Sequence, residues 1–209
     1  MDAIENIRKI SNDELNHLGS HLEYNYENQT TDGNFMVDVF IEISKNSHIK
    51  YEYDKKRKAL LCDRILHTPL NYQFNYGFIP NTLSEDGDPI DAVVIMEDKL
   101  IPGCYINCKL IGVLETKDDA GNDPKLIMLP SEKIDPTYSG YNNITEISRP
   151  TRDKIKYFFS HYKDLENKHV VIGEFKDKEE AFRIYKESIK RFNKTFEFSN
   201  KITNYYKQL

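Results

Sequence analysis

The sequence feature that most constrains the fold is a turn crowded with carboxylates, Asp86-Gly-Asp88-Pro-Ile-Asp91. Its glycine and proline favour a tight turn, and the apolar run at residues 90–96 predicts a buried strand directly after it. Two carboxylates about 4 Å apart repel by roughly 4 kcal/mol at an effective dielectric near 20, so the cluster needs protons or a hard cation. We predict a divalent metal site here, with Mg2+ as the metal.

This turn has two other interpretations. If Asp86 were the first position of an EF-hand loop, Ile90 would stand where an oxygen ligand belongs, and Asp91 where the loop requires glycine. An EF-hand is therefore excluded. A solvated acidic turn remains the alternative, and the rest of the chain has to decide between it and a metal site.

A second turn dense in carboxylates, residues 117–125, carries Asp118 and Asp123 around another glycine and proline. Two acidic turns at strand ends are typical of two halves of one site, although a solvated hairpin tip is the alternative. In the strand predicted at residues 125–129, Lys125 shares its face with apolar residues. A lysine rarely takes such an inward position without a carboxylate or another anion to contact.

The first predicted strands carry further candidate site residues. Apolar residues alternate along residues 35–43, which leaves Glu42 on the opposite face as a surface or site residue. In residues 49–53, Lys50 and Glu52 share one face, so a cation lies beside a carboxylate. An ordinary exposed ion pair is the alternative for these two residues.

Further along, a short strand at residues 59–62 is expected to lead into a loop that carries Arg64. Tyr72 and Tyr76 flank the approach to the first acidic turn. Tyrosines at such positions usually belong to the core, but a phenol can also donate a hydrogen bond to a phosphate oxygen.

Two helices are predicted near the C-terminal end. Pro150 stands at a favoured early helical position, and apolar residues recur at helical spacing as far as Leu165, with Tyr162 at the buried edge and Lys163 beside it. A second helix is expected over residues 177–192. Strands followed by helices predict an α+β domain.

The 209 residues are sufficient for one domain with a sizeable core, and no break in composition indicates a second. We expect a single domain over residues 1–209. Its core is expected at about 35–192, with an accessory N-terminal segment, 1–33, and an accessory C-terminal tail, 195–209.

Charge and composition exclude some partners. The net charge of −5 argues against a nucleic-acid surface, which requires a basic face. Three cysteines form no disulfide framework, which favours small buried thiols in a reducing compartment. There is no signal-peptide pattern and no apolar run of membrane length, so we expect a cytoplasmic protein without membrane contact.

The candidate residues together suggest a reaction. Carboxylates gather metal ions, while lysine, arginine and tyrosine hold phosphate oxygens. Metal ions can lower the pKa of a shared water and clamp the oxygens of a phosphoryl transfer. Because phosphoryl transfer is catalysed mainly by positioning and charge neutralisation, these residues could support it without a Ser, Cys or His nucleophile.

With these residues in this order, the chain resembles soluble family I inorganic pyrophosphatases. The first acidic turn, continued by Ala92, matches the family's signature. The other matching pieces are, in chain order, FIEI with Glu42, IKYE with Lys50 and Glu52, DR with Arg64, NYGFIPNT with Tyr76, DDAGNDPK with Asp118, Asp123 and Lys125, and HYKDLE with Tyr162 and Lys163. The resemblance covers about residues 35–192.

The resemblance implies a role for each matching residue. Asp88 would orient and deprotonate the attacking water, and Arg64 or the tyrosines, Tyr76 among them, would assist the leaving group. The implied metal ligands are Asp86, Asp91, Asp118 and Asp123, with Glu42 and Glu52 at the rim. The implied phosphate-binding residues are Lys50, Arg64, Tyr76, Lys125, Tyr162 and Lys163.

The implied fold is α+β and mainly β, a small closed OB-like β-barrel flanked by two C-terminal helices. The implied reaction is Mg2+-dependent hydrolysis of pyrophosphate to two phosphates, with several Mg2+ ions in each active site. The implied assembly is a homo-oligomer, with a hexamer as the first expectation and a dimer as the second.

Two other functions remain open from the sequence alone. An OB-like barrel could instead be a binding module for a nucleic acid or a protein, which would require a basic, aromatic groove. The site could also hydrolyse a larger phosphoanhydride, such as a nucleotide or polyphosphate.

Overall fold

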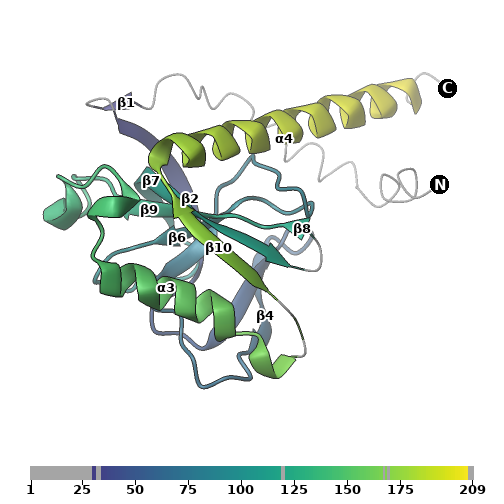
Figure 1. Cartoon of the computed structure of the whole chain (residues 1–209). Coiled ribbons are helices and arrows are strands. Elements are labelled where there is room, and N and C mark those ends of the chain that lie inside the picture. Colours follow the sequence, from purple (N-terminus) through teal and green to yellow (C-terminus); the bar gives the residue numbers. More distant parts are fainter. Residues whose placement is uncertain (1–29, 32–33, 119–120, 167, 169, 207–209) are drawn as a thin grey trace.

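The computed structural model describes residues 30–31, 34–118, 121–166, 168 and 170–206 (Figure 1). Its elements are, in chain order, β1 (Thr30–Thr31), β2 (Asn34–Ile43), β3 (Ile49–Asp54), β4 (Ala59–Ile65), β5 (Asn75–Phe78), β6 (Asp91–Val94), β7 (Tyr105–Asp118), β8 (Gly121–Asn122), β9 (Lys125–Pro130), η2 (Pro136–Tyr138), η3 (Ile144–Glu146), α3 (Arg149–His161), η4 (Asp164–Glu166), β10 (Val171–Lys176) and α4 (Lys178–Tyr206). Most of the predicted N-terminal segment, residues 1–29 and 32–33, lies outside the described residues.

Five strands close into a mixed β-barrel. Their order is β2-β5-β6-β9-β7, and an additional pairing of β2 with β7 completes the ring. Neighbours pair antiparallel except β6 and β9, which are parallel. The strands β3 and β4 form a separate two-stranded sheet. The prediction of a closed barrel flanked by two C-terminal helices is confirmed.

Two local features allow the ring to close. The long strand β7 pairs with β2 near its start and with β9 further along, and its register with β9 shifts between Leu110 and Gly112. Such irregularities bend a strand. On the other side, a Cβ at Gly77 would lie 1.8 Å from the Phe40 carbonyl oxygen. Only glycine therefore permits the close approach of β5 to β2.

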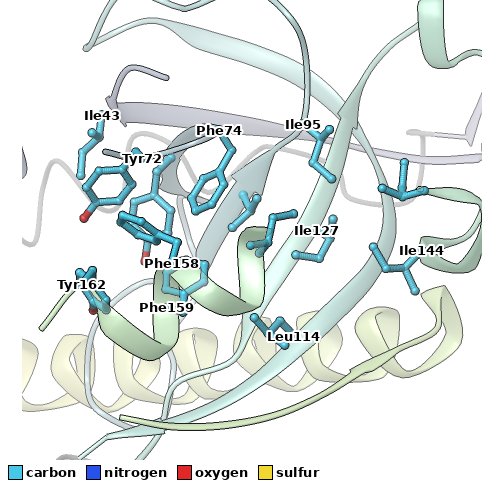
Figure 2. Packing of buried hydrophobic residues seen from close by; sticks show 14 of the residues in the cluster. Ile43, Tyr72, Phe74, Ile95, Leu114, Ile127, Ile144, Phe158, Phe159 and Tyr162 are labelled. Atoms are coloured by element: carbon cyan, nitrogen blue, oxygen red, sulfur yellow. The ribbon is translucent and has the colours of Figure 1, made fainter. Parts of the chain in front are cut away.

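The core consists of two clusters on opposite faces of shared strands. On β6 and β9, Val93 and Ile127 belong to the cluster that packs against α3; Figure 2 labels Ile127 of this cluster together with Phe158 and Phe159 of α3. Neighbouring residues such as Val94 belong to the second cluster, with Ala181 and Tyr185 of α4. Strands covered on both faces read as continuous apolar runs, which explains the apolar run after the first acidic turn.

The boundaries of three predicted elements differ in the structure. The strand that begins at residue 59 continues to Ile65, so Arg64 lies in β4 and not in a loop. Helix α3 ends at His161, and Leu165 falls in η4 with 62% of its surface exposed. Helix α4 does not stop near residue 192 but continues to Tyr206, through most of the expected tail (Figure 1).

Two expectations from composition can be compared with the described residues. Cys108 is buried, but Cys62 is exposed, so the prediction of uniformly buried thiols is wrong for Cys62. No helix in the described part of the chain is long and apolar enough to span a membrane.

Candidate active site

Both acidic turns line one cavity of about 360 Å³, within the range typical of small-molecule sites. The cavity lies between the barrel and the β3–β4 sheet, and carboxylates and cationic side chains line it in nearly equal number. The lining residues are Glu42, Lys50, Glu52, Tyr53, Lys55, Asp63, Arg64, Tyr76, Phe78, Asp86, Asp88, Pro89, Asp91, Asp123, Lys125, Tyr162, Lys163 and Lys168. The two acidic segments are thus not simply a solvated turn and a solvated hairpin tip, because both line this cavity.

Backbone hydrogen bonds hold the first acidic turn in shape. Ser84 N–H donates to the Asp88 carbonyl oxygen over 2.7 Å, and Asp88 N–H donates to the Asp86 carboxylate over 3.0 Å. Gly87 between them has φ of +94°, which L side chains rarely adopt. Among the described residues, no hydrogen bond or ion pair occupies the exposed Asp88 carboxylate. That carboxylate is available to contact water or a ligand.

The parallel pairing of β6 and β9 brings the two acidic turns together. Asp91 and Lys125 are the first residues of these strands and are direct partners across the sheet. Lys125 Nζ lies 2.5 Å from Asp91 Oδ2 and 2.5 Å from Asp123 Oδ1. Asp123 N–H also donates to the Thr116 carbonyl oxygen over 2.9 Å, which anchors the second turn to β7. The inward lysine predicted from the sequence therefore contacts one carboxylate from each turn.

The electrostatics of this cluster follow from burial. Burial works against the Lys125 charge, but the two neighbouring carboxylates outweigh it and raise the pKa of Lys125 above its ordinary value. Burial, together with the charges of Asp91 and Asp86, raises the pKa of Asp123 to about 7 despite the contact with Lys125. Burial also raises the pKa of Asp86. The single positive charge of Lys125 is thus insufficient to neutralise the carboxylates around it.

Glu42 is a buried carboxyl group on the cavity wall. Only 9% of its surface is exposed, and its Oε1 accepts a hydrogen bond from Tyr53 N–H over 2.7 Å. Burial raises the pKa of Glu42 to about 7, against the opposing effect of this hydrogen bond. Glu42, on the polar face of β2, thus faces the cavity.

The β3–β4 sheet contributes two cationic side chains, Lys50 and Arg64, next to an irregularity in the pairing of its strands. Lys50 pairs with Arg64, and Tyr51 with Cys62, so Asp63 is the extra residue between them. Bulges of this kind redirect side chains. Asp63 contacts both cations, with Lys50 Nζ 3.6 Å from its Oδ2 and Arg64 Nη1 bonded to it. Lys50 Nζ also pairs with Glu52 on its own face, as the alternation predicted.

Phenols and a further lysine come from β5 and the end of α3. Tyr162 caps α3, donating its N–H to the Phe158 carbonyl oxygen over 2.9 Å, and its ring stacks on Phe158. Lys163 Nζ lies 5.3 Å from the centre of the Tyr162 ring. Tyr76 is 7% exposed, and burial raises its pKa well above the ordinary value. Its phenol therefore stays protonated and keeps a hydrogen to donate.

Twelve of the thirteen site residues predicted from the sequence line this one cavity. The backbone of Asp118 ends β7, but its side chain lies outside the described residues. Sequence reasoning missed Tyr53, Asp63 and Lys168 among the lining residues. Asp63 adjoins Arg64, and its alignment toward the site depends on the bulge, which no local pattern predicted.

The donor chemistry fits a hard divalent cation. Carboxylate oxygens are the ligands that Mg2+ prefers, and burial together with neighbouring carboxylates raises the pKa of Asp86 and of Asp123 even though Lys125 lies nearby. In the described part of the chain, however, no three His, Cys, Asp or Glu side chains already converge tightly enough to hold a metal ion. Lys125 lies between Asp91 and Asp123 in this arrangement.

The closed barrel and its cavity of carboxylates, cations and phenols together define a hydrolase that acts on a phosphoanhydride. A family model described as inorganic pyrophosphatase matches residues 39–193. The chain belongs to the inorganic pyrophosphatase family, and its activity is that of an inorganic diphosphatase. Enzymes of this family use divalent metal ions.

Individual relatives support this assignment. An inorganic pyrophosphatase of Helicobacter pylori is 50% identical over 155 residues, which are 74% of this chain and 90% of that protein. One from Nanoarchaeum equitans is 48% identical, over 76% of this chain and 98% of that protein. The solved Helicobacter pylori structure superposes with a TM-score of 0.74 and 48% identity, covering 76% of this chain and 94% of that one.

Proposed function

We propose that the cavity hydrolyses pyrophosphate to two phosphates by direct attack of a water that Asp88 orients and deprotonates. The observation that carries this proposal is the convergence of both acidic turns on Lys125, beside a cationic rim. The free carboxylate of Asp88 is available to accept the proton of the water. A bound substrate would be surrounded by groups that bind phosphate oxygens.

The proposed metal is Mg2+, with several ions in each active site. The residues that would hold the ions are Asp86, Asp91, Asp118 and Asp123, with Glu42 and Glu52 at the rim. When bound, the ions supply charge neutralisation at the phosphate oxygens and acidify the attacking water. The excess of partly buried carboxylates over the single charge of Lys125 supports this assignment.

The phosphate groups of the substrate would be held by the cationic and phenolic rim. The proposed binding residues are Lys50, Arg64, Tyr76, Lys125, Tyr162 and Lys163. Arg64 offers a planar set of donors suited to phosphate oxygens. Tyr76 stays protonated and donates a hydrogen bond. As charge develops on the leaving phosphate, Arg64 and Tyr76 stabilise it, which gives both a part in catalysis as well as in binding.

The direct test is phosphate release from pyrophosphate, with Mg2+ and with a chelator. We expect release with Mg2+ and none after chelation. Asp88→Asn should fold normally and lose about 10²- to 10⁴-fold in kcat, as expected for a lost general base. Glu85→Gln is the matched control, because Glu85 lies in the same turn but bonds Asn122 outside the cavity. Near-normal turnover by the Asp88 variant would contradict the assigned base.

We further propose one cytoplasmic enzyme domain with a core at residues 35–192, a proposal that the matched span 39–193 supports. The segments 1–33 and 195–209 are proposed as accessory. We also propose a homo-oligomer, a hexamer before a dimer, on the family resemblance. Light scattering of the purified chain gives the mass in solution, and a monomer at working concentrations would refute it.

A further inference from the structure

A partly buried ion pair joins Arg64 of the cavity lining to Glu166, a residue far away in the sequence. Arg64 Nε lies 2.9 Å from both carboxylate oxygens of Glu166. The Glu166 side chain is only 5% exposed, and that of Arg64 is 20% exposed. Charge-assisted hydrogen bonds with little solvent access are stronger than exposed ion pairs. Glu166 itself is not among the described residues that line the cavity.

Glu166 also belongs to the segment that carries two other rim residues. It ends η4, directly after α3, and its N–H donates to the Lys163 carbonyl oxygen over 2.9 Å. Lys163 and its neighbour Tyr162 both line the cavity. Arg64, by contrast, comes from β4, which among the described strands pairs with β3 alone, in a sheet separate from the barrel. Glu166 therefore links cationic groups that no shared strand or helix holds together.

The contact restricts which donors of Arg64 can reach a ligand. Glu166 occupies Nε, and Asp63 occupies Nη1. A guanidinium group is planar, so two fixed donors set the orientation of the whole plane. Because Arg64 lines the cavity, the remaining donors are the ones available to a phosphate oxygen.

We propose that Glu166 is a positioning residue for catalysis, which orients Arg64 and fixes its distance from Tyr162 and Lys163 in the cavity lining. This inference rests on the proposed function, in which these three residues hold the phosphates. Glu166 makes no contact with substrate and acts through Arg64. Misplacing a binding group by about 1 Å can cost on the order of 10²-fold in rate, so a lost tether should be measurable.

The test is a double-mutant cycle on pyrophosphate hydrolysis with Mg2+. Glu166→Gln keeps the size of the side chain but removes its charge, and we expect kcat/KM to fall by about 10- to 100-fold. The fall should largely disappear in the Arg64→Ala background, because Glu166 then has no guanidinium to orient. The inhibition constant of the product, inorganic phosphate, should rise in Glu166→Gln, an effect that a merely structural role would not produce.

Asp164→Asn is the matched control, because Asp164 lies in the same 3-10 helix but pairs with His161 over 2.9 Å. It should retain wild-type kcat/KM. Additive losses from Glu166→Gln and Arg64→Ala would overturn the inference, as would a Glu166→Gln enzyme as active as the control.

If Glu166→Gln fails to fold, Glu166→Asp tests the same point, since it keeps the charge and withdraws the carboxylate by one methylene. It should also lose kcat/KM, and full activity would overturn the inference. The wild-type enzyme separates the two proposals: absence of Mg2+-dependent phosphate release contradicts the proposed function, whereas an active wild type with additive variants contradicts only the role of Glu166.

Discussion

Replacing Glu42 by Gln should stabilise the metal-free protein at neutral and alkaline pH. Burial raises the pKa of Glu42 from 4.5 to about 7, so the folded protein binds this proton more tightly than the unfolded chain. The stability contributed by Glu42 is complete below pH 4.5 and is lost as the pH rises through 7. A shift of this size corresponds to about 3 kcal/mol, at roughly 1.4 kcal/mol per pKa unit.

The glutamine variant has no proton to lose in this window. Its amide resembles the protonated carboxyl group and can still accept the hydrogen bond from Tyr53 N–H. The difference in free energy of unfolding between Glu42→Gln and wild type should therefore grow by about 3 kcal/mol between pH 4.5 and pH 8. Activity should fall at the same time, because functional sites often keep groups that destabilise the fold, and replacing such a group gains stability at the expense of function.

The measurement is urea unfolding in a chelating buffer at a series of pH values. Glu97→Gln is the control, because the Glu97 side chain is 82% exposed, and its effect should stay within about 0.5 kcal/mol. Other titrating groups are common to wild type and variant, so they cancel in the difference. If the difference in free energy of unfolding between variant and wild type does not change with pH, burial does not raise the pKa of Glu42 and the prediction is refuted.

Three further predictions concern the barrel and the acidic cluster. Lys125→Met leaves two partly buried carboxylates without their cation and should cost about 3–5 kcal/mol in chelator, with partial recovery in Mg2+, measured by urea unfolding; equal stability in both buffers would refute it. Gly77→Ala should prevent folding or cost more than about 4 kcal/mol, because its Cβ would overlap the backbone of β2. Gly140→Ala, with nothing within 4 Å of the added Cβ, should unfold at nearly the wild-type temperature. Since burial raises the pKa of Asp123 to about 7, Mg2+ binding should release protons and weaken as the pH falls below 7, seen by calorimetry in buffers of different ionisation enthalpy; heats independent of buffer would contradict this.

Local patterns in the sequence predicted elements well where one face of an element is buried. The alternation along β2 indicated its inner face and left Glu42 on the other. Pro150 predicted the start of α3, where Ser148 caps the helix. Predicted ends were less accurate, because the mixture of polar and aromatic residues after Phe192 did not indicate a helix, yet α4 continues through them to Tyr206. Arg64 was assigned to a loop because a bulge interrupts the alternation of β4.

The sequence alone determined the residue types of the site, the turns that carry them and the family resemblance, because turn chemistry, side-chain periodicity and short motifs are local. The tertiary structure decided which of these segments meet. The parallel pairing of β6 and β9 places Asp91 beside Lys125, and the tertiary fold brings Glu166 of η4 to Arg64 of β4. Both contacts join residues distant in the chain, and their free energy depends on the burial and alignment of whole elements. No pattern within a single segment contains that information.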